Sequence, residues 1–311
     1  MPWPEGCVWR DQPLANHTSF RIGGPAEWFA QPKTIEELRE VLRQTARLGL
    51  PLTVVGGGTN TLAADRGVRG VVIHLSRGFR GVDIVSSPEE LMARVRCGAG
   101  VLTQRLVYLA AKHGWGELEL LAGLPGQIGG AVTMNAQHIG RFVRQVTQVA
   151  LDGTVRQVAR EQLRFGYRDS SLEPGIIVEV ELEFPRIPAA QAYERIHRAL
   201  AYRNTTQDLR VPSAGCAFKN PPGLAAGRLI DQSGLKGLRV GDAQISTRHA
   251  NFIVNLGQAS CDDVLGLMEH VQRLVWKQHG VVLEPEVRLV GERWPLAPPQ
   301  TGAGLAERAR P

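Results

Sequence analysis

Two glycine-rich segments constrain the fold of this chain more than any other feature: VVGGGTN at residues 54–60 and LAGLPGQIGGAV at residues 121–132. Glycine loses more conformational entropy on folding than any other residue, so consecutive glycines indicate that side chains are excluded there for a reason. Neither segment matches GxGxxG before a helix or the P-loop pattern GxxxxGK(S/T), which argues against Rossmann and Walker sites. Taken singly, each segment would rather indicate a tight turn that binds nothing. Together, their bare backbone N–H groups suit the pyrophosphate of a dinucleotide.

The first glycine-rich segment follows a predicted helix and strand. Residues 34–49 carry apolar side chains at helical spacing, Thr34 and Glu37 have the spacing of a capping box, and Gly49 is placed to end the helix. The strand LTVV at 52–55 comes directly afterwards. Apolar patterns predict further strands at 71–75, 92–97, 176–184 and 281–291, helices at 101–114, 189–202 and 260–280, and a hairpin at 149–158 that turns at Asp152 and Gly153.

This order of elements predicts an α+β chain with several domains. Two α/β subdomains are expected at residues 1–75 and 76–187, and a smaller α+β domain at 188–294, after a break marked by Pro185 and Pro188. The tail at 295–311 is rich in Pro, Gly and Ala, and we expect it to be poorly ordered.

The composition limits the partners of the chain. Its net charge of +6 favours anionic ligands, but the basic residues are dispersed, so we expect no nucleic-acid partner. The four cysteines form no CxxC pair, so we expect no metal site, and we expect Cys7, Cys97 and Cys261 to be buried, reduced thiols. No apolar leader or membrane-spanning window is present, which predicts a cytoplasmic protein with no membrane partner.

A series of motifs then occurs in one order along the chain: NHTSFRIGGPAEWF (16–29), LTVVGGGTNTLAAD (52–65), LAGLPGQIGGAVTMNA (121–136), FGYRDS (165–170), SAGCAFKNPPG (213–223) and LEPEVRLVG (283–291). Together these motifs resemble the UDP-N-acetylenolpyruvoylglucosamine reductase family, from Asn16 to Gly291. The short, mostly helical segment between Phe184 and Ser213 favours the type that lacks a substrate-domain insertion.

The resemblance implies a fold and an activity. The fold is the vanillyl-alcohol-oxidase (PCMH) type of FAD-binding fold, with two α/β subdomains and a C-terminal substrate-binding domain. FAD is expected to be noncovalent, because no histidine lies in the first glycine-rich segment. NADPH would reduce FAD, which would then reduce the enolpyruvyl double bond of a UDP-sugar to give UDP-N-acetylmuramate for peptidoglycan. We favour a monomer.

The resemblance also implies a set of FAD-binding residues, most of them in the two glycine-rich segments: Arg21, Val55, Gly56, Gly57, Gly58, Thr59, Asn60, Gly98, Gly123, Pro125, Gly126, Ile128, Gly129, Gly130 and Ala131.

The resemblance assigns catalytic roles to Arg168, Cys216 and Glu286. Arg168 suits a fixed cation that stabilises a developing enolate, because guanidinium binds carboxylates in a bidentate manner. Glu286 would polarise the substrate carboxylate and help to stabilise the enol. Cys216 stands where the family commonly has serine; a thiol, with a pKa of about 8.5, is the better acid and could donate the proton. An inert buried cysteine is the alternative.

Further residues are expected in the substrate pocket, with Lys219 and Asn220 the stronger candidates and Tyr167, Gln232, His249 and Asn251 the weaker ones. Glu284 matches no catalytic position and is expected to be solvated, and Pro285 beside it suggests an edge strand. The loop around Gln137 and His138 departs from the family pattern of a small residue followed by Tyr and Gly, so its shape is expected to differ.

Two other functions stay open. One is another FAD oxidase or dehydrogenase of the same superfamily, which Arg168, Cys216 and Glu286 together disfavour. The other is a nucleotide-binding protein without catalysis, which is disfavoured because only 6% of the residues are aromatic and no basic stripe is present.

Overall fold

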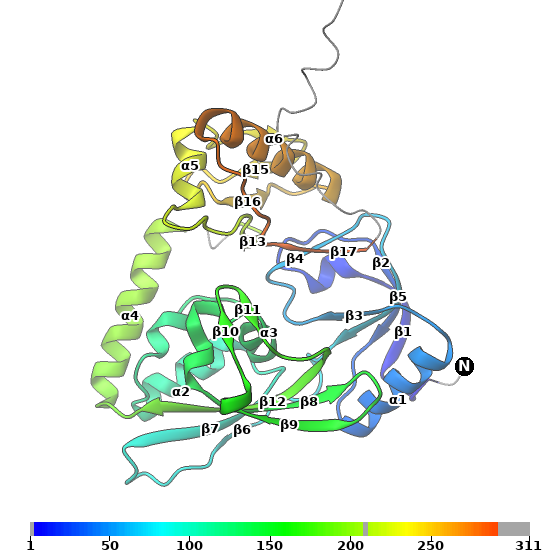
Figure 1. The fold of residues 1–311 in the computed structure, drawn as a ribbon, viewed down its shortest axis with the longest axis vertical. Coiled ribbons are helices and arrows are strands. Elements are labelled where there is room, and N and C mark those ends of the chain that lie inside the picture. The colour runs from blue at the N-terminus through cyan, green and yellow to red at the C-terminus, as the bar shows by residue number, and fades with distance from the viewer. Residues whose placement is uncertain (1–2, 208–210, 292–311) are drawn as a thin grey trace, which may run out of the picture. The chain divides into compact units, whose positions relative to one another are not determined.

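The computed structural model describes residues 3–207 and 211–291 (Figure 1). The chain forms two compact units, both discontinuous in sequence. The first unit comprises Met1–Gln12, Ala26–Gly58 and Arg69–Thr205, and the second comprises Pro13–Pro25, Thr59–Val68 and Thr206–Pro311. The predicted domains at 1–75, 76–187 and 188–294 are continuous, so their boundaries stay a prediction. The predicted tail at 295–311 lies outside the described residues.

A four-stranded sheet with the order β1-β2-β5-β3 opens the chain. Its strands are β1 (Val8–Pro13), β2 (Pro25–Ala30), β5 (Val68–His74) and β3 (Leu52–Val55). The predicted strands at 52–55 and 71–75 are confirmed, and they pair in parallel. Both faces of β5 are covered, so nearly all of its residues are buried. This burial explains why its sequence is a continuous apolar run and does not alternate.

Helix α1 (Ile35–Arg47) confirms the predicted helix and one half of its capping box. Thr34 accepts a hydrogen bond from the backbone N–H of Glu37 at 3.1 Å. The Glu37 carboxylate instead accepts from the N–H of Lys33 at 2.7 Å, one residue before the position that a capping box requires. Gly49 follows the helix with a φ of +62°, as expected for the glycine that ends it.

The larger sheet of the first unit is antiparallel, in the order β6-β7-β12-β8-β9. Its strands are β6 (Val82–Ile84), β7 (Met92–Gly98), β12 (Gly175–Pro185), β8 (Val143–Ala150) and β9 (Val155–Ala159). Strand β12 alternates buried and half-buried residues as predicted, apart from a bulge between Ile177 and Glu179. The hairpin of β8 and β9 turns at Asp152, which accepts from Thr154 N, and Gly153 as predicted.

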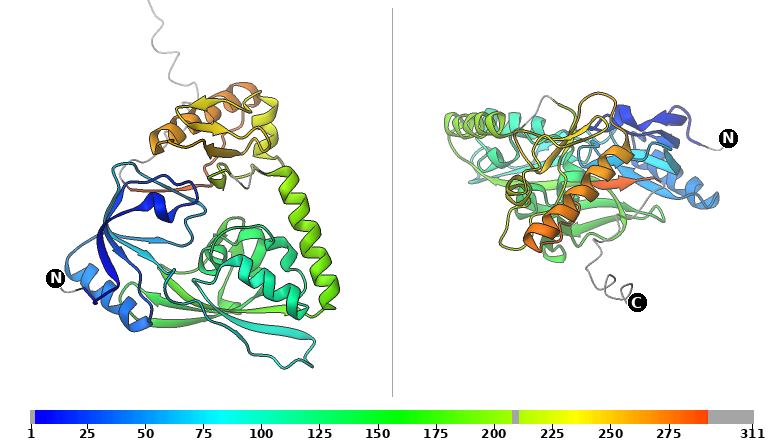
Figure 2. Two further views of the ribbon diagram at one scale, coloured as in Figure 1. Left: turned by 180° about the vertical axis from the view of Figure 1, so that it is seen from behind. Right: turned by 90° about the horizontal axis from the view of Figure 1, so that it is seen from above.

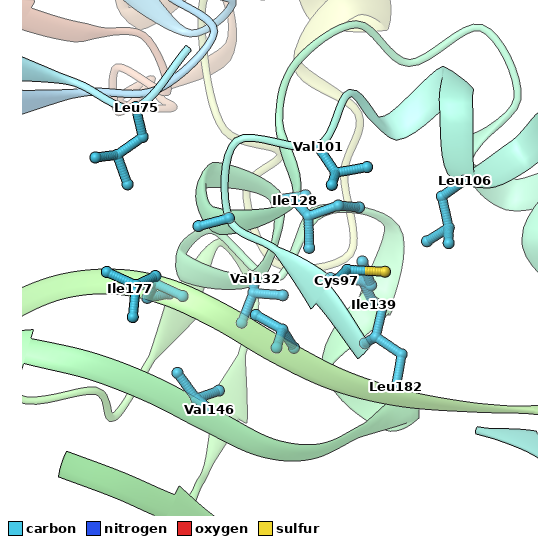
Figure 3. Close-up of a cluster of buried hydrophobic side chains, with 14 of the residues drawn as sticks. Leu75, Cys97, Val101, Leu106, Ile128, Val132, Ile139, Val146, Ile177 and Leu182 are labelled. Carbon is cyan, nitrogen blue, oxygen red and sulfur yellow. The ribbon is translucent and has the colours of Figure 1, made fainter. Parts of the chain in front are cut away.

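Helices α2 (Thr103–His113) and α3 (Ile128–Thr133) lie on one face of this sheet (Figure 1). Figure 3 shows Ile128 and Val132 of α3 beside Cys97 of β7 and Leu182 of β12, and all four are fully buried. This core fixes α3 on the sheet, and with it the second glycine-rich segment, whose residues 128–132 belong to this helix. Helix α4 (Ala189–Thr206) then runs without a break and confirms the predicted helical segment (Figure 1).

The second unit is built on a four-stranded sheet with the order β13-β16-β15-β14. Its strands are β13 (Ser213–Cys216), β16 (Phe252–Asn255), β15 (Ala243–Ile245) and β14 (Arg239–Val240), and its helices are the short η1 (Leu14–His17), α5 (Ala226–Gln232) and α6 (Cys261–His279). Helix α6 packs on β14 and β15 (Figure 2) and confirms the predicted helix, with Ser260 and Asp263 forming a complete capping box.

The strand predicted at 281–291 is largely wrong. Only β17 (Arg288–Val290) is a strand, and it pairs in parallel with β4 (Thr61–Ala63). Pro285 has no N–H to donate, and it forms only an isolated bridge with Phe218. The segment before β17 is therefore held by single contacts and not by a ladder. Within the described residues, no helix is long and apolar enough to cross a membrane.

Candidate active site

The two glycine-rich segments lie against each other within the first unit. A Cβ atom added to Gly57 would lie 3.0 Å from the Cα of Gly126. A Cβ atom added to Gly56 would meet the Gln127 side chain at 3.8 Å and the Cα of Gly130 at 4.0 Å. The structure thus brings together two turns that are separated by more than sixty residues of sequence.

Some of the predicted FAD-binding glycines have a purely internal explanation. A Cβ on Gly98 would lie 2.0 Å from the carbonyl oxygen of Phe79, and one on Gly129 would lie 2.9 Å from the Cβ of Ala99. The backbone of Phe79 excludes a side chain at Gly98, and the methyl group of Ala99 leaves no room for one at Gly129. Three other glycines of the turns adopt positive φ angles: Gly58, Gly123 and Gly126.

Gly56 and Gly130 have no such explanation. A Cβ on Gly130 would meet nothing within 4 Å, and one on Gly56 would make only ordinary contacts. Among the described residues, the backbone N–H groups of Gly56 and Gly57 have no hydrogen-bond acceptor. Open space beside bare N–H groups is what a phosphate-binding concavity requires, so these residues fit the diphosphate of FAD.

The remaining predicted FAD-binding residues fall into different groups. Val55, Ile128 and Ala131 are buried in the core, so any ligand contact would come from their backbone. Pro125 is exposed in the second turn. Thr59, Asn60 and Arg21 belong to the second unit, where Arg21 is exposed with a φ of +56°.

Arg168 lies at the tip of a short hairpin in the first unit. Strands β10 (Phe165–Gly166) and β11 (Asp169–Ser170) pair, so Tyr167 and Arg168 form a two-residue turn. Arg168 has a φ of +57°, a left-handed conformation that costs a non-glycine residue about 1–3 kcal/mol. Its guanidinium carbon lies 5.1 Å from the centre of the Tyr167 ring, an arrangement that orients the cation.

Hydrogen bonds join this hairpin to α3, the helix that contains the end of the second glycine-rich segment. The Ser170 hydroxyl donates to the carbonyl of Thr133 at 3.0 Å, and the Thr133 hydroxyl donates to the carbonyl of Gly129 at 2.9 Å. Two hydrogen bonds therefore link the Arg168 hairpin to the glycine turn through α3.

Cys216 and Glu286 come together in the second unit. Cys216 ends β13 and is half-buried, while the other three cysteines are buried, as predicted. The backbone N–H of Glu286 donates to the carbonyl of Ala217 at 2.8 Å. Because Ala217 directly follows Cys216, this bond places the backbone of Glu286 beside that of the cysteine. The Asn60 side chain donates to the carbonyl of Glu286 at 3.0 Å, which adds a structural role to its predicted FAD contact.

Burial keeps two of the other thiols protonated. It raises the pKa of Cys7 to about 11 and the pKa of Cys97 to about 12. A thiolate is the reactive form of cysteine, so these residues are inert near neutral pH. Within the described residues, no cluster of His, Cys, Asp and Glu could hold a metal ion.

Lys219 and Glu284 form an ion pair between the two segments that carry Cys216 and Glu286. Their side chains approach to 3.3 Å, and the Lys219 N–H donates to the Glu284 carbonyl at 2.8 Å. Glu284 is 73% exposed, in agreement with the expectation that it is solvated. Such an exposed pair is weak, so an incoming phosphate could replace the glutamate.

Two of the predicted substrate residues serve as scaffold. Asn251 is 2% exposed, and its amide both accepts from the N–H of Phe218 and donates to the carbonyl of Phe218. The Asn220 side chain accepts from the N–H of Ala226 at the start of α5.

The weaker substrate candidates differ in exposure. Gln232 is exposed at the end of α5, and Tyr167 is 46% exposed. The ring of His249 packs 4.5 Å from the ring of Phe252, and burial lowers its pKa. Its Nδ1 atom is buried and has no hydrogen-bond partner among the described residues.

Sequence reasoning missed Asn135 and Gly140, which support the Arg168 hairpin. Asn135 has a φ of +44°, and Gln137 and His138 have values of +50° and +59°. The departure of this loop from the family pattern was the only signal. The unusual backbone lies at the residues where a local difference in shape is expected, and that difference stays a prediction. Arg168 lies in the first unit, and Cys216 and Glu286 lie in the second.

Comparison with known proteins agrees with these features. The family described as UDP-N-acetylenolpyruvoylglucosamine reductase, C-terminal domain, matches residues 207–290, and the FAD binding domain family matches residues 26–159. The reductase of Pelobacter propionicus is 40% identical over 92% of this chain and 97% of its own length, and that of Geobacter metallireducens is 43% identical over 92% and 95%.

A solved structure gives the same result. The crystal structure of UDP-N-acetylenolpyruvylglucosamine reductase from Thermus caldophilus superposes with a TM-score of 0.76 at 39% identity, over 91% of this chain and 98% of that one. These matches extend over both units, confirm the PCMH-type FAD-binding fold and agree with the expected α+β content. The chain therefore belongs to the UDP-N-acetylenolpyruvoylglucosamine reductase family.

Proposed function

We propose that this chain uses NADPH and FAD to reduce the enolpyruvyl double bond of UDP-N-acetylenolpyruvoylglucosamine, giving UDP-N-acetylmuramate for peptidoglycan. The observation that carries this proposal is the match to named reductases over more than nine tenths of the chain. The open, side-chain-free backbone at Gly56 and Gly130 supports FAD as the cofactor.

Bound FAD supplies the redox chemistry, because it accepts electrons from NADPH and passes them to the substrate. Gly56, Gly57 and Gly130 would hold its diphosphate through backbone N–H groups. Helix α3 would keep the Gly130 N–H in place without reorganisation, since the apolar side chains of this helix are buried on the sheet.

Arg168 would stabilise the negative charge that builds on the substrate carboxylate as the double bond is reduced. A cation that is already positioned stabilises such charge better than one that must move. The hairpin supports this role, because Ser170 of strand β11 is bonded to α3 and the guanidinium lies over the Tyr167 ring.

Cys216 would donate the proton that completes the reduction, and Glu286 would polarise the substrate carboxylate and help to stabilise the enol. The half-buried position of Cys216 supports this assignment, because it is accessible where the other cysteines are not. The hydrogen bond between Glu286 and Ala217 keeps the two residues on adjacent backbone.

Lys219 would bind the substrate diphosphate by exchanging Glu284 for it, and Asn220, Gln232, His249 and Tyr167 would line the remainder of the pocket. Asn251 would act there by fixing Phe218 and not by direct contact. We further propose that the protein is a monomer and that it lies in the cytoplasm. The four free cysteines support the second proposal, because disulfides are rare in reducing compartments.

The visible spectrum of the purified protein tests this proposal. Flavin bands that NADPH bleaches and UDP-N-acetylenolpyruvoylglucosamine restores, in the absence of oxygen, are the expected result. Restoration by oxygen alone, without an effect of the sugar nucleotide, would identify an oxidase instead. A colourless protein that does not take up added FAD would leave a nucleotide-binding protein without this activity.

A further inference from the structure

We infer that Asn135 is a positioning residue for Arg168: its side-chain amide holds the base of the hairpin that presents the guanidinium. The inference rests on the proposed role of Arg168 in the reduction. Asn135 itself contacts no reacting group in this scheme, and it acts through the backbone of its neighbours.

The Asn135 amide is used at both ends. Its Nδ2 donates to the carbonyl of Gly166 at 2.7 Å, and its Oδ1 accepts from the N–H of Gly140 at 2.9 Å. The residue is 5% exposed, so water cannot replace either bond easily. Gly166 directly precedes the Tyr167–Arg168 turn, so one side chain joins the loop after α3 to the foot of the hairpin.

The hairpin is anchored to the same part of the unit at two other points. The ring of Phe165 occupies the space beside Gly140, where an added Cβ would lie 2.3 Å from the ring. Ser170, on the opposite strand, donates to the carbonyl of Thr133. Both strands are thus fixed, and their contacts determine the position of the turn between them.

The backbone around Asn135 is held in a conformation that few residues adopt. Asn135, Gln137 and His138 all have left-handed φ angles. Asparagine tolerates this region better than most residues, and such conformations persist only where surrounding contacts determine them. The left-handed turn at Arg168 is the second strained point. The amide of Asn135 joins the two, because it bonds the carbonyl of Gly166 next to that turn.

Two substitutions separate this role from general damage to the fold. Asn135→Gly removes the amide but accepts the left-handed backbone without strain. Asn135→Asp keeps an acceptor for Gly140 and removes the donor to Gly166. Asn255→Asp is the matched control, because Asn255 is also buried, donates to the carbonyl of Phe20 and accepts from Gly257 and Ala259 in the second unit.

Turnover with saturating NADPH and UDP-N-acetylenolpyruvoylglucosamine should fall about tenfold or more in Asn135→Gly, since small misplacements of a catalytic group are costly. In an Arg168→Ala background the same substitution should change turnover by less than about twofold, because the residue through which it acts is gone. Hydrogen–deuterium exchange at residues 165–171, measured without substrate, should rise in Asn135→Gly and stay unchanged in Asn255→Asp.

Unchanged exchange at residues 165–171 would overturn the inference whatever the activity. An equal loss of turnover with and without Arg168 would overturn it too, because Asn135 would then act by another route. Normal turnover in Arg168→Ala alone would refute the proposed role of Arg168. The exchange measurement would still decide whether Asn135 holds the hairpin.

Discussion

The Arg168 hairpin and the Cys216–Glu286 region reach the same end, a fixed polar group, by different means. The hairpin has only short strands, and side-chain hydrogen bonds from Asn135 and Ser170 secure it. Cys216 ends β13, an edge strand of a four-stranded sheet, and the backbone N–H of Glu286 donates to the carbonyl of Ala217. The hairpin carries a left-handed residue at its functional position, whereas Cys216 and Glu286 have no positive φ.

This difference indicates where each region is vulnerable. Backbone hydrogen bonds tolerate exchange of side chains, because they do not depend on residue type. A turn secured by a few side chains loses its position when one of them is removed. Substitutions should therefore separate chemistry from placement cleanly around Cys216, and less cleanly around Arg168.

The largest effect is expected from Cys216→Ala, which should lower turnover by about 10²–10⁴-fold because the proton donor is lost. Reduction of the bound flavin by NADPH should continue at its normal rate, as followed by rapid-mixing absorbance. Cys216→Ser should remain active, because a hydroxyl at this position can still donate. Normal turnover in the alanine variant would remove Cys216 from the mechanism.

Arg168→Ala should lower turnover by about 10²–10³-fold, the cost of removing one group that stabilises developing charge. Arg168→Gly should lose as much activity. Its free energy of unfolding should nevertheless be about 1 kcal/mol higher than that of the alanine variant, since glycine accepts the left-handed turn. Urea denaturation of both proteins measures the difference. Equal stabilities would mean that the hairpin stores no strain at its tip.

Asn251→Ala should destabilise the second unit by about 1–3 kcal/mol, because the buried backbone groups of Phe218 lose their partners. Gln145→Ala is a suitable control, since its hydrogen bond to Gln157 is on the surface and its loss should cost less than about 0.5 kcal/mol. Denaturant unfolding compares the two. A similar small cost at both sites would show that Asn251 does not hold the Cys216 region in place.

The smallest effect concerns pH. Burial lowers the pKa of His249, so the unfolded chain binds more protons than the folded protein in the window below about pH 6.5. The free energy of unfolding should therefore have its full value above that pH and decrease as the pH falls. His249→Gln should flatten this dependence without removing it, because burial lowers the pKa of His17 as well. An unchanged slope in urea titrations from pH 5 to pH 8 would contradict the assignment.

Much of the fold could be predicted because its signals are local. The caps at Thr34 and Ser260, and the glycines that end the helices, act through residues next to them in sequence. Strand β12 shows its buried face by simple alternation. The strand predicted at 281–291 failed because Pro285 prevents a ladder that the apolar pattern alone suggests.

The site was only partly predictable for a related reason. Motif resemblance located Arg168, Cys216 and Glu286, and the glycine turns were visible as sequence. The supporting contacts of Asn135, Asn251 and Asn60 were not, because each joins its partner across 31 to 226 residues of sequence. Nothing in the residue type of an asparagine tells which distant carbonyl it will bind.

The sequence by itself determined the family, the helices and most strands, and the two turns that exclude side chains, since these depend on residue type and local spacing. Only the tertiary structure decided which glycines are open to a ligand and which are filled by neighbouring backbone, as at Gly130 and Gly98. The same holds for Asn251, whose amide bonds the backbone of the distant Phe218. The physical reason is that space and hydrogen-bond partners belong to the packed chain, where segments distant in sequence meet.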